Sequence, residues 1–252
     1  MIFDSHAHYN DHAFELDADA LLNSMKENNV GYIMNACSKL SEMNDILNLC
    51  ANHPEVYGSV GIHPECACKW SDEIEQEITK YGASDKICAI GEIGLDYYWD
   101  TVPRDIQKEC FDSQLSLAEK LHMPVIIHDR EAHKDSLDIA SLHKGLKGVF
   151  HCFSGSREMA AQVLDLGYYI AFGGSLTFKN NVKTVEVAKY VPLDRMVVET
   201  DCPYLTPVPY RGKRNSSLYL CHVIDKIAEI KGVSAEEVEN ITCQNAKKLY
   251  NI

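Results

Sequence analysis

Short apolar runs alternate with amphipathic segments from one end of the chain to the other, and this alternation limits the fold more than any other feature. Strands that alternate with helices pair in parallel beneath a helical layer, and eight such units close a barrel. We therefore expect the α/β class and a single TIM-like (β/α)8 barrel. The predicted strands are residues 2–4, 31–36, 56–61, 87–92, 125–128, 148–151, 168–171 and 196–199, with helices at 18–28, 41–52, 72–80, 103–121, 132–142, 158–166 and 182–189.

Two further helical patterns, residues 217–230 and 234–250, follow the predicted barrel. The second opens on Ser234, with Glu237 at capping-box spacing. We expect both C-terminal helices to pack on the outside of the barrel. A length of 252 residues suits one such barrel, and we find no internal repeat and no linker rich in proline and glycine. The sequence therefore predicts one domain, residues 1–252.

The composition narrows the classes of partner. A formal net charge of −13 argues against a broad nucleic-acid surface of lysine and arginine, so any contact with a nucleic acid must be local. The chain starts without a basic and apolar leader and contains no apolar run approaching the ~20 residues of a membrane helix. We expect a cytoplasmic protein without membrane contact, as a monomer or weak oligomer, whose ten cysteines are mostly buried thiols.

The carboxylate of Glu92 points to the chemistry. Glu92 ends an apolar run, with Gly91 before it and Gly94 shortly after, and a buried carboxylate is costly unless cations or a metal ion face it. The carboxyl ends of barrel strands meet at one mouth. Other residues of the kinds that bind metal ions also close or follow an apolar run, namely His6, His8, His128, His151 and Asp201. Four imidazoles and two carboxylates predict a divalent-metal centre at that mouth.

The spacing of these residues suggests how two ions would be held. His6 and His8 share one face of an extended chain and can bind one ion, which Asp201 completes. Glu92 can bridge to a second ion on His128 and His151. We expect hydrolysis, with Asp201 accepting the proton of the attacking water and Glu199 supporting the ligands from behind. Zinc, manganese, nickel and, less well, magnesium suit these ligands.

Other residues could bind a substrate. His63 either contacts the substrate or makes a structural hydrogen bond. The run 209–214 carries Arg211, Lys213 and a further arginine, which suit a phosphate group, although from charge alone a solvated loop explains them slightly better. Aromatic side chains that could stack on nucleobases are Tyr97, Tyr98, Trp99 and Tyr210.

Motifs across nearly the whole chain resemble the TatD-type metal-dependent deoxyribonucleases of the amidohydrolase superfamily. They lie at residues 3–8, 60–64, 90–98, 124–128, 151–155, 199–205 and 209–215. The resemblance implies a two-metal hydrolase that acts on DNA, often from the 3′ end of single strands, with the same six ligands. Two positions depart from the family pattern, which usually has serine at Cys202 and aspartate at Asn10. Glu92 takes the place of the carboxylated lysine bridge that is frequent in the superfamily.

Three functions are consistent with these observations. The first is a 3′–5′ exonuclease-type phosphodiesterase acting on DNA at the barrel mouth. The second is hydrolysis of a carboxylic ester or amide, such as deacylation of a D-aminoacyl-tRNA, since the same activated water would serve both reactions. The third is a non-enzymatic scaffold with structural metal ions. Structural zinc sites usually have a closed shell of Cys and His. The ligands predicted here include two carboxylates, so the third function is disfavoured.

Overall fold

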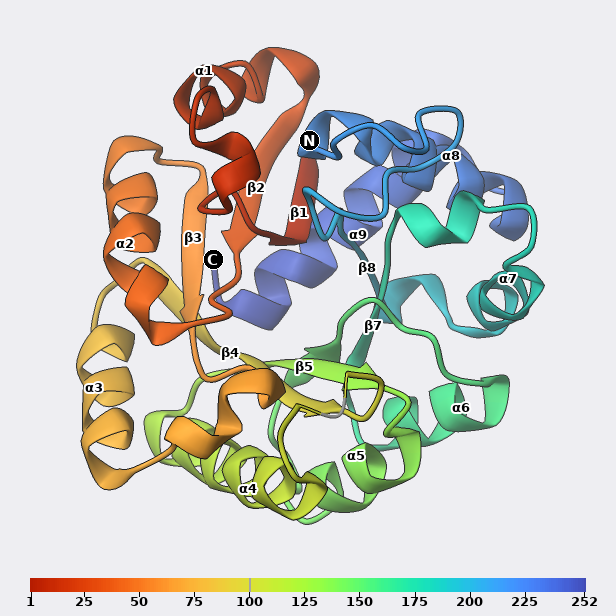
Figure 1. The fold of residues 1–252 in the computed structure, drawn as a ribbon. Coiled ribbons are helices and arrows are strands. Elements are labelled where there is room, and N and C mark those ends of the chain that lie inside the picture. Colours follow the sequence, from red (N-terminus) through yellow and green to blue (C-terminus); the bar gives the residue numbers. More distant parts are fainter. Residues whose placement is uncertain (100) are drawn as a thin grey trace.

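The computed structural model of the chain describes residues 1–99 and 101–252. Within them, eight parallel strands pair in chain order and helices surround them, so the predicted barrel is confirmed (Figure 1). The largest difference is that the fourth strand continues four residues past Glu92. The strands are β1 (Ile2–Ala7), β2 (Val30–Asn35), β3 (Val56–Val60), β4 (Ile87–Asp96), β5 (Val125–Arg130), β6 (Gly148–Phe150), β7 (Tyr169–Phe172) and β8 (Met196–Val198).

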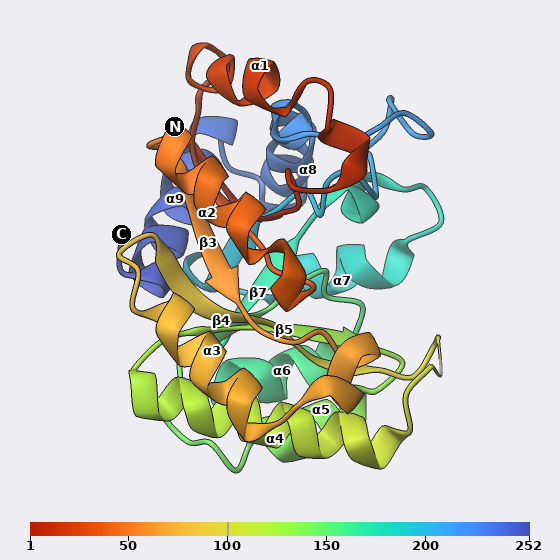
Figure 2. The same ribbon diagram turned by 60° about the vertical axis from the view of Figure 1, so that its left-hand side comes forward.

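Each predicted helix is present, and most of the outer helices pack against a strand that they follow or precede (Figure 2). The first helix stops at Asn23 rather than at residue 28, because a 3-10 turn follows and Asn29 has a positive φ of 65°. None of the described helices is both long and apolar enough to cross a membrane. The helices are α1 (Ala18–Asn23), α2 (Met43–Asn52), α3 (Asp72–Gly82), α4 (Arg104–Leu121), α5 (His133–Ala140), α6 (Arg157–Asp165), α7 (Val182–Tyr190), α8 (Leu220–Lys231) and α9 (Ala235–Tyr250).

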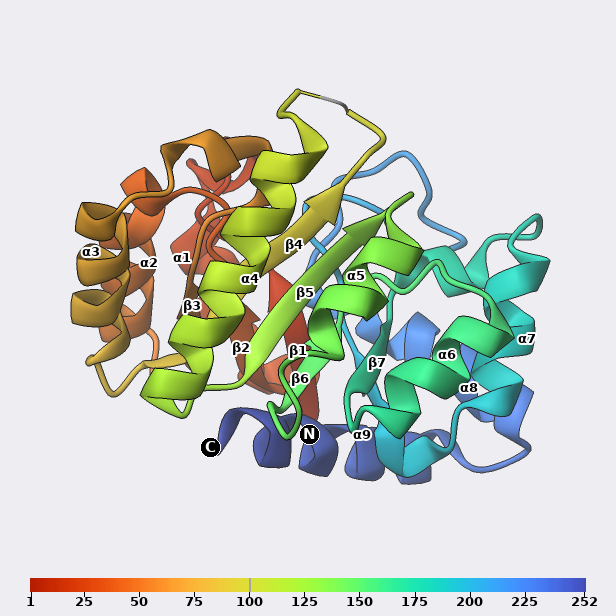
Figure 3. The same ribbon diagram turned by 90° about the horizontal axis from the view of Figure 1, so that it is seen from below.

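The helix α9 closes one end of the barrel, so the expectation that both C-terminal helices pack outside is wrong for α9. Figure 3 shows α9 crossing beneath the strands, near the N-terminus. Its buried side chains pack against the barrel interior, and the Tyr250 hydroxyl donates to the carbonyl of Ser5 at 2.9 Å. The interior residues are Phe3, Met34, Ala89, Ile126, Val149, Ala171 and Val197. They would meet water at this end without an apolar cover.

The seam between β1 and β8 is closed by few backbone contacts and by a buried side chain. One isolated bridge pairs Ala7 with Cys202, whose carbonyl also accepts from the His8 amide at 3.0 Å. Below it, the buried carboxylate of Asp4 accepts from the Thr200 amide at 2.9 Å and from the Thr200 hydroxyl at 2.6 Å. Ser217 donates its hydroxyl to the same carboxylate at 2.6 Å. Burial raises the pKa of Asp4 to about 6, against the lowering effect of these hydrogen bonds.

We predict that Asp4→Ala lowers the free energy of unfolding by about 3 kcal/mol, because it leaves buried donors of Thr200 and Ser217 without an acceptor. Ser217→Ala removes two buried hydrogen bonds of the Ser217 hydroxyl, to Asp4 at 2.6 Å and with the Tyr9 hydroxyl at 2.8 Å, and should cost about 2 kcal/mol. Urea unfolding followed by circular dichroism measures both variants. Equal stability of Asp4→Ala and the wild type would contradict this role of the seam.

Candidate metal centre

Irregular register in two strands turns predicted ligands into the barrel. Phe3 and Ala89 belong to the interior, so strict alternation would send His6 and Glu92 outward. The ladder between β1 and β2 shifts between Asp4 and Ala7, and the ladder between β4 and β5 shifts between Ile90 and Ile93. Such irregularities invert the alternation and re-aim side chains. They explain why His6 and Glu92 point toward the mouth.

The other ligands follow plain alternation from interior residues. His128 lies two residues after Ile126, and His151 lies two residues after Val149. Asp201 follows β8 with a positive φ of 54°, a conformation that aspartate tolerates better than most residues. Gly94 lets β4 approach β5 closely, because a Cβ there would lie 2.0 Å from the carbonyl oxygen of His128.

Each carboxylate oxygen of Glu92 faces a different pair of imidazoles. Oε1 lies 2.7 Å from His128 Nδ1 and 2.8 Å from His151 Nε2. Oε2 lies 3.5 Å from His6 Nε2 and 3.8 Å from His8 Nε2. Asp201 Oδ1 lies 3.7 Å from His6 Nε2 and 3.5 Å from His8 Nε2. The structure therefore brings the six predicted ligands together, with Glu92 between the two histidine pairs.

The donor set fits divalent ions. Nε2 of His6 lies 3.0 Å from Nε2 of His8, and Nδ1 of His128 lies 3.2 Å from Nε2 of His151. Ligand bonds of about 2.0–2.2 Å place neighbouring ligand atoms of one ion roughly 3 Å apart. Neutral imidazoles and carboxylates are also the ligand types of zinc and manganese. The convergent nitrogens can thus hold a metal with little movement.

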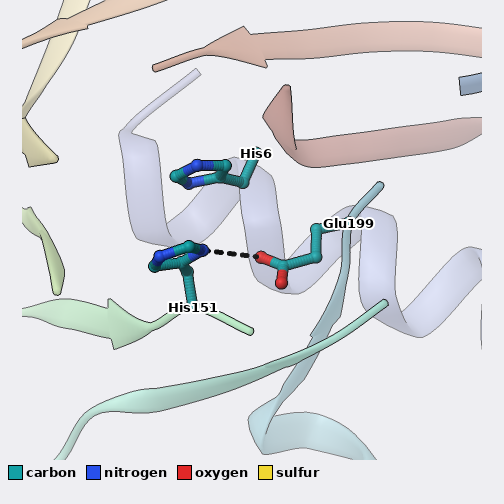
Figure 4. Close-up of side chains that lie close together, drawn as sticks. All are labelled: His6, His151 and Glu199. Atoms are coloured by element: carbon teal, nitrogen blue, oxygen red, sulfur yellow. Dashed lines mark ion pairs between the residues drawn. The ribbon is translucent and has the colours of Figure 1, made fainter. Parts of the chain in front are cut away.

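Asp96 and Glu199 lie next to two of these histidines, on the side of each ring that faces away from Glu92. Asp96 Oδ2 lies 3.0 Å from Nε2 of His128, the nitrogen that points away from Glu92. Glu199 is fully buried, accepts from the Cys152 amide at 2.6 Å and lies 3.9 Å from Nδ1 of His151 (Figure 4). Burial, with the charge of Asp201 adding to it, raises the pKa of Glu199 well above its usual value. Sequence reasoning assigned no role to Asp96, although Asp96 shares the β4 face of Glu92 at a spacing of four.

The metal-free centre carries opposite charges at neutral pH. Burial opposes ionisation of Glu92, but the neighbouring His151 and His6 hold its pKa well below the usual value. Burial also opposes protonation of His8 and His128, and their carboxylate partners outweigh it. Asp201 and Glu92 raise the pKa of His8 to about 9, and Asp96 and Glu92 raise the pKa of His128 to about 10.

The centre lies in the wall of a cavity of about 790 Å³. His63 lines it, with Nε2 3.7 Å from Glu92 Oε1, and accepts from the Glu65 amide at 3.3 Å. Both expectations for His63, substrate contact and a structural hydrogen bond, are thus geometrically possible. The cationic side chains of this wall are Lys39, Arg130 and Lys183.

Arg211 and Lys213 are exposed and do not belong to the described wall of this cavity. The Arg211 guanidinium lies 4.0 Å over the ring of Phe178, and the Lys213 ammonium lies 5.3 Å over the ring of Tyr210. The structure therefore does not bring these two cations to the histidine cluster. Charge and sequence position alone could not reveal the direction of this loop.

A parallel barrel with imidazoles and carboxylates at the carboxyl ends of its strands defines the class of metal-dependent hydrolase barrels. The family model described as TatD related DNase matches residues 3–251. The chain belongs to this family and is a metal-dependent hydrolase, which confirms the resemblance found in its motifs.

Relatives support this assignment over the full length. The uncharacterized metal-dependent hydrolase YabD of Bacillus subtilis is 39% identical over 254 residues, covering 100% of both chains. The 3'-5' ssDNA/RNA exonuclease TatD of Erwinia tasmaniensis is 31% identical, covering 95% of each chain. The crystal structure of YJJV, a TatD homolog from Escherichia coli, superimposes with a TM-score of 0.93 at 29% identity, covering 100% of this chain and 98% of that one.

We predict that metal binding at pH 7 releases about two protons per loaded protein, because His8 and His128 must give up their protons to become ligands. Since their pKa values are raised, apparent metal affinity should increase as pH rises from 7 toward 9. Calorimetric titration with Mn²⁺ in buffers of different ionisation enthalpy counts the protons. His222→Ala, on α8 outside the cavity, is the matched control, and binding without proton release would contradict the prediction.

Proposed function

We propose that the chain is a deoxyribonuclease, a 3′–5′ exonuclease-type phosphodiesterase that acts on DNA at the barrel mouth. The observation that carries the proposal is the position of Glu92 in the wall of a cavity of about 790 Å³. One oxygen of its carboxylate faces one histidine pair, and the other oxygen faces the second pair. This volume lies within the range of small-ligand sites and has room for nucleotide units of a strand. The description of the family and the name of the Erwinia relative support DNA as the substrate.

The chain's own residues have distinct tasks in this proposal. One ion would be held by His6, His8 and Asp201, and the other ion would be held by His128 and His151. The carboxylate of Glu92 would bind both ions. When bound, the ions would lower the pKa of a water and offset charge on a phosphate. The histidines, chiefly through the hydrogen bond from His8, keep the pKa of Asp201 below its usual value despite burial. Asp201 is therefore ionised at neutral pH and can accept the proton of the attacking water.

The wall of the cavity supplies the local contacts that an acidic protein needs for a polyanion. Lys39, Arg130 and Lys183 line the wall and would each contact a phosphate, while bound metal ions would offset part of the charge of the seven described carboxylates that line it as well. Long-range repulsion by the chain's net charge of −13 slows encounter with DNA, so binding depends on short-range phosphate contacts.

We expect Glu92→Gln to lower DNA cleavage by roughly a thousandfold or more, because the amide keeps the shape but loses the charge that bridges two cations. The assay uses metal-stripped protein reloaded with Mg²⁺, Mn²⁺ or Zn²⁺, and single-stranded DNA labelled at either end, so that the product ladder also gives polarity. Unchanged thermal stability of the variant without added metal would show that its fold is intact. Full activity of Glu92→Gln would contradict the proposal.

Variants that remove positive charge inside and outside the cavity distinguish DNA cleavage from ester hydrolysis. Lys39→Ala and Lys183→Ala should each raise KM for DNA about five- to tenfold and lessen its salt dependence, because each removes a phosphate contact. The double variant Arg211→Ala, Lys213→Ala is the matched control outside the cavity and should change KM less than twofold. Hydrolysis of a carboxylic ester or a D-aminoacyl-tRNA, without DNA cleavage by the wild type, would instead favour the alternative function.

A further inference from the structure

Trp99 is an aromatic side chain in the wall of the catalytic cavity with more than half of its surface exposed. Its relative exposure is 55%, whereas the other tryptophan, Trp70, is partly buried and packs against the hydrophobic core. Trp99 lines the same cavity as Glu92 and His128. An exposed indole in a cavity wall offers a large, rigid apolar face to a ligand.

The backbone of Trp99 is held by the same carboxylate that orients His128. Asp96 Oδ1 accepts from the amides of Tyr98 at 2.9 Å and Trp99 at 3.1 Å, while its Oδ2 faces His128. The side chain of Gln107, from α4, clamps the Asp96 backbone, accepting from its amide at 2.8 Å and donating to its carbonyl at 3.0 Å. The indole is therefore attached to a fixed point beside the metal centre.

A cation lies next to this aromatic pair. The guanidinium of Arg130, on the neighbouring strand β5, lies 4.0 Å over the ring of Tyr98 and 5.5 Å from that of Trp99. Tyr98 packs against Trp99 with ring centroids 5.0 Å apart. An aromatic surface and a guanidinium side by side match the two chemical parts of a nucleotide, a flat base and a phosphate.

We propose that Trp99 determines substrate specificity by stacking on an unpaired nucleobase next to the bond that is cleaved, while Arg130 contacts a phosphate of the same strand. This inference rests on the proposed nuclease function and deepens it. A base inside a duplex has both faces covered by its neighbours, so only a frayed or single-stranded end can offer a free face to Trp99. Stacking tolerates any base, so Trp99 selects strand state rather than sequence.

The test compares Trp99→Ala and Trp99→Phe with Tyr190→Ala. Tyr190 is a matched control, since it is also an exposed aromatic beside an arginine, Arg157 at 4.7 Å, but it does not line the cavity. On a single-stranded 12-mer we expect Trp99→Ala to raise KM about five- to hundredfold, Trp99→Phe to recover part of the loss, and Tyr190→Ala to behave as the wild type. On a 12-mer with abasic sites at its three 3′-terminal positions, Trp99→Ala and wild type should differ less than twofold.

Two outcomes overturn the inference: equal KM of Trp99→Ala and wild type on the intact strand, or an equal loss on the intact and abasic strands, which marks a structural role. Anisotropy of the same fluorescent 12-mer on metal-free protein separates this result from failure of the nuclease proposal. If the wild type cleaves no DNA but Trp99→Ala weakens binding, the nuclease proposal fails and the stacking role stands. If the wild type cleaves DNA and Trp99→Ala binds and cleaves equally well, the stacking role alone fails.

Discussion

The position of the metal centre depends on how the barrel closes between its first and last strands. A regular ladder would need backbone pairs along the whole seam, but β8 is short and one isolated bridge joins the strands there. The carboxylate of Asp4 takes the place of missing acceptors by binding Thr200 and Ser217. Immediately above, the Asp201 amide donates to the carbonyl of His6 at 2.9 Å. The seam thus sets the candidate ligands His6 and Asp201 beside one another.

At the mouth, the electrostatics of one buried carboxylate organise the surrounding side chains. Glu92 is 4% exposed, and the free energy of burying its charge would be prohibitive without the facing imidazoles. In the metal-free protein, protonated His8 and His128 supply positive charge, and Asp201 and Asp96 balance these two in turn. Divalent ions can replace those protons without rearranging the shell.

Asp96 links the chemistry to the cavity rim. One of its oxygens faces His128, and the other holds the backbone of Tyr98 and Trp99. A displacement of the rim would therefore also shift the partner of His128, and a displacement of His128 would act on the rim. The three cations of the described wall lie on separate elements, since Lys39 follows β2, Arg130 ends β5 and Lys183 lies in α7. Seven carboxylates of the described residues line the same wall, so positive charge there is confined to separate points.

The sequence by itself determined the eight strands, the helices between them, the family and the set of candidate ligands, because hydrophobic periodicity and ligand-type residues at strand ends are local properties. It also predicted that the six candidate ligands meet at one mouth, because the carboxyl ends of parallel barrel strands converge there. Only the tertiary structure decided that register shifts turn His6 and Glu92 inward, that α9 covers the barrel's lower end, and that Arg211 and Lys213 stay outside the cavity. These features depend on pairing with neighbouring strands and on contacts between distant segments, neither of which a period-two pattern contains.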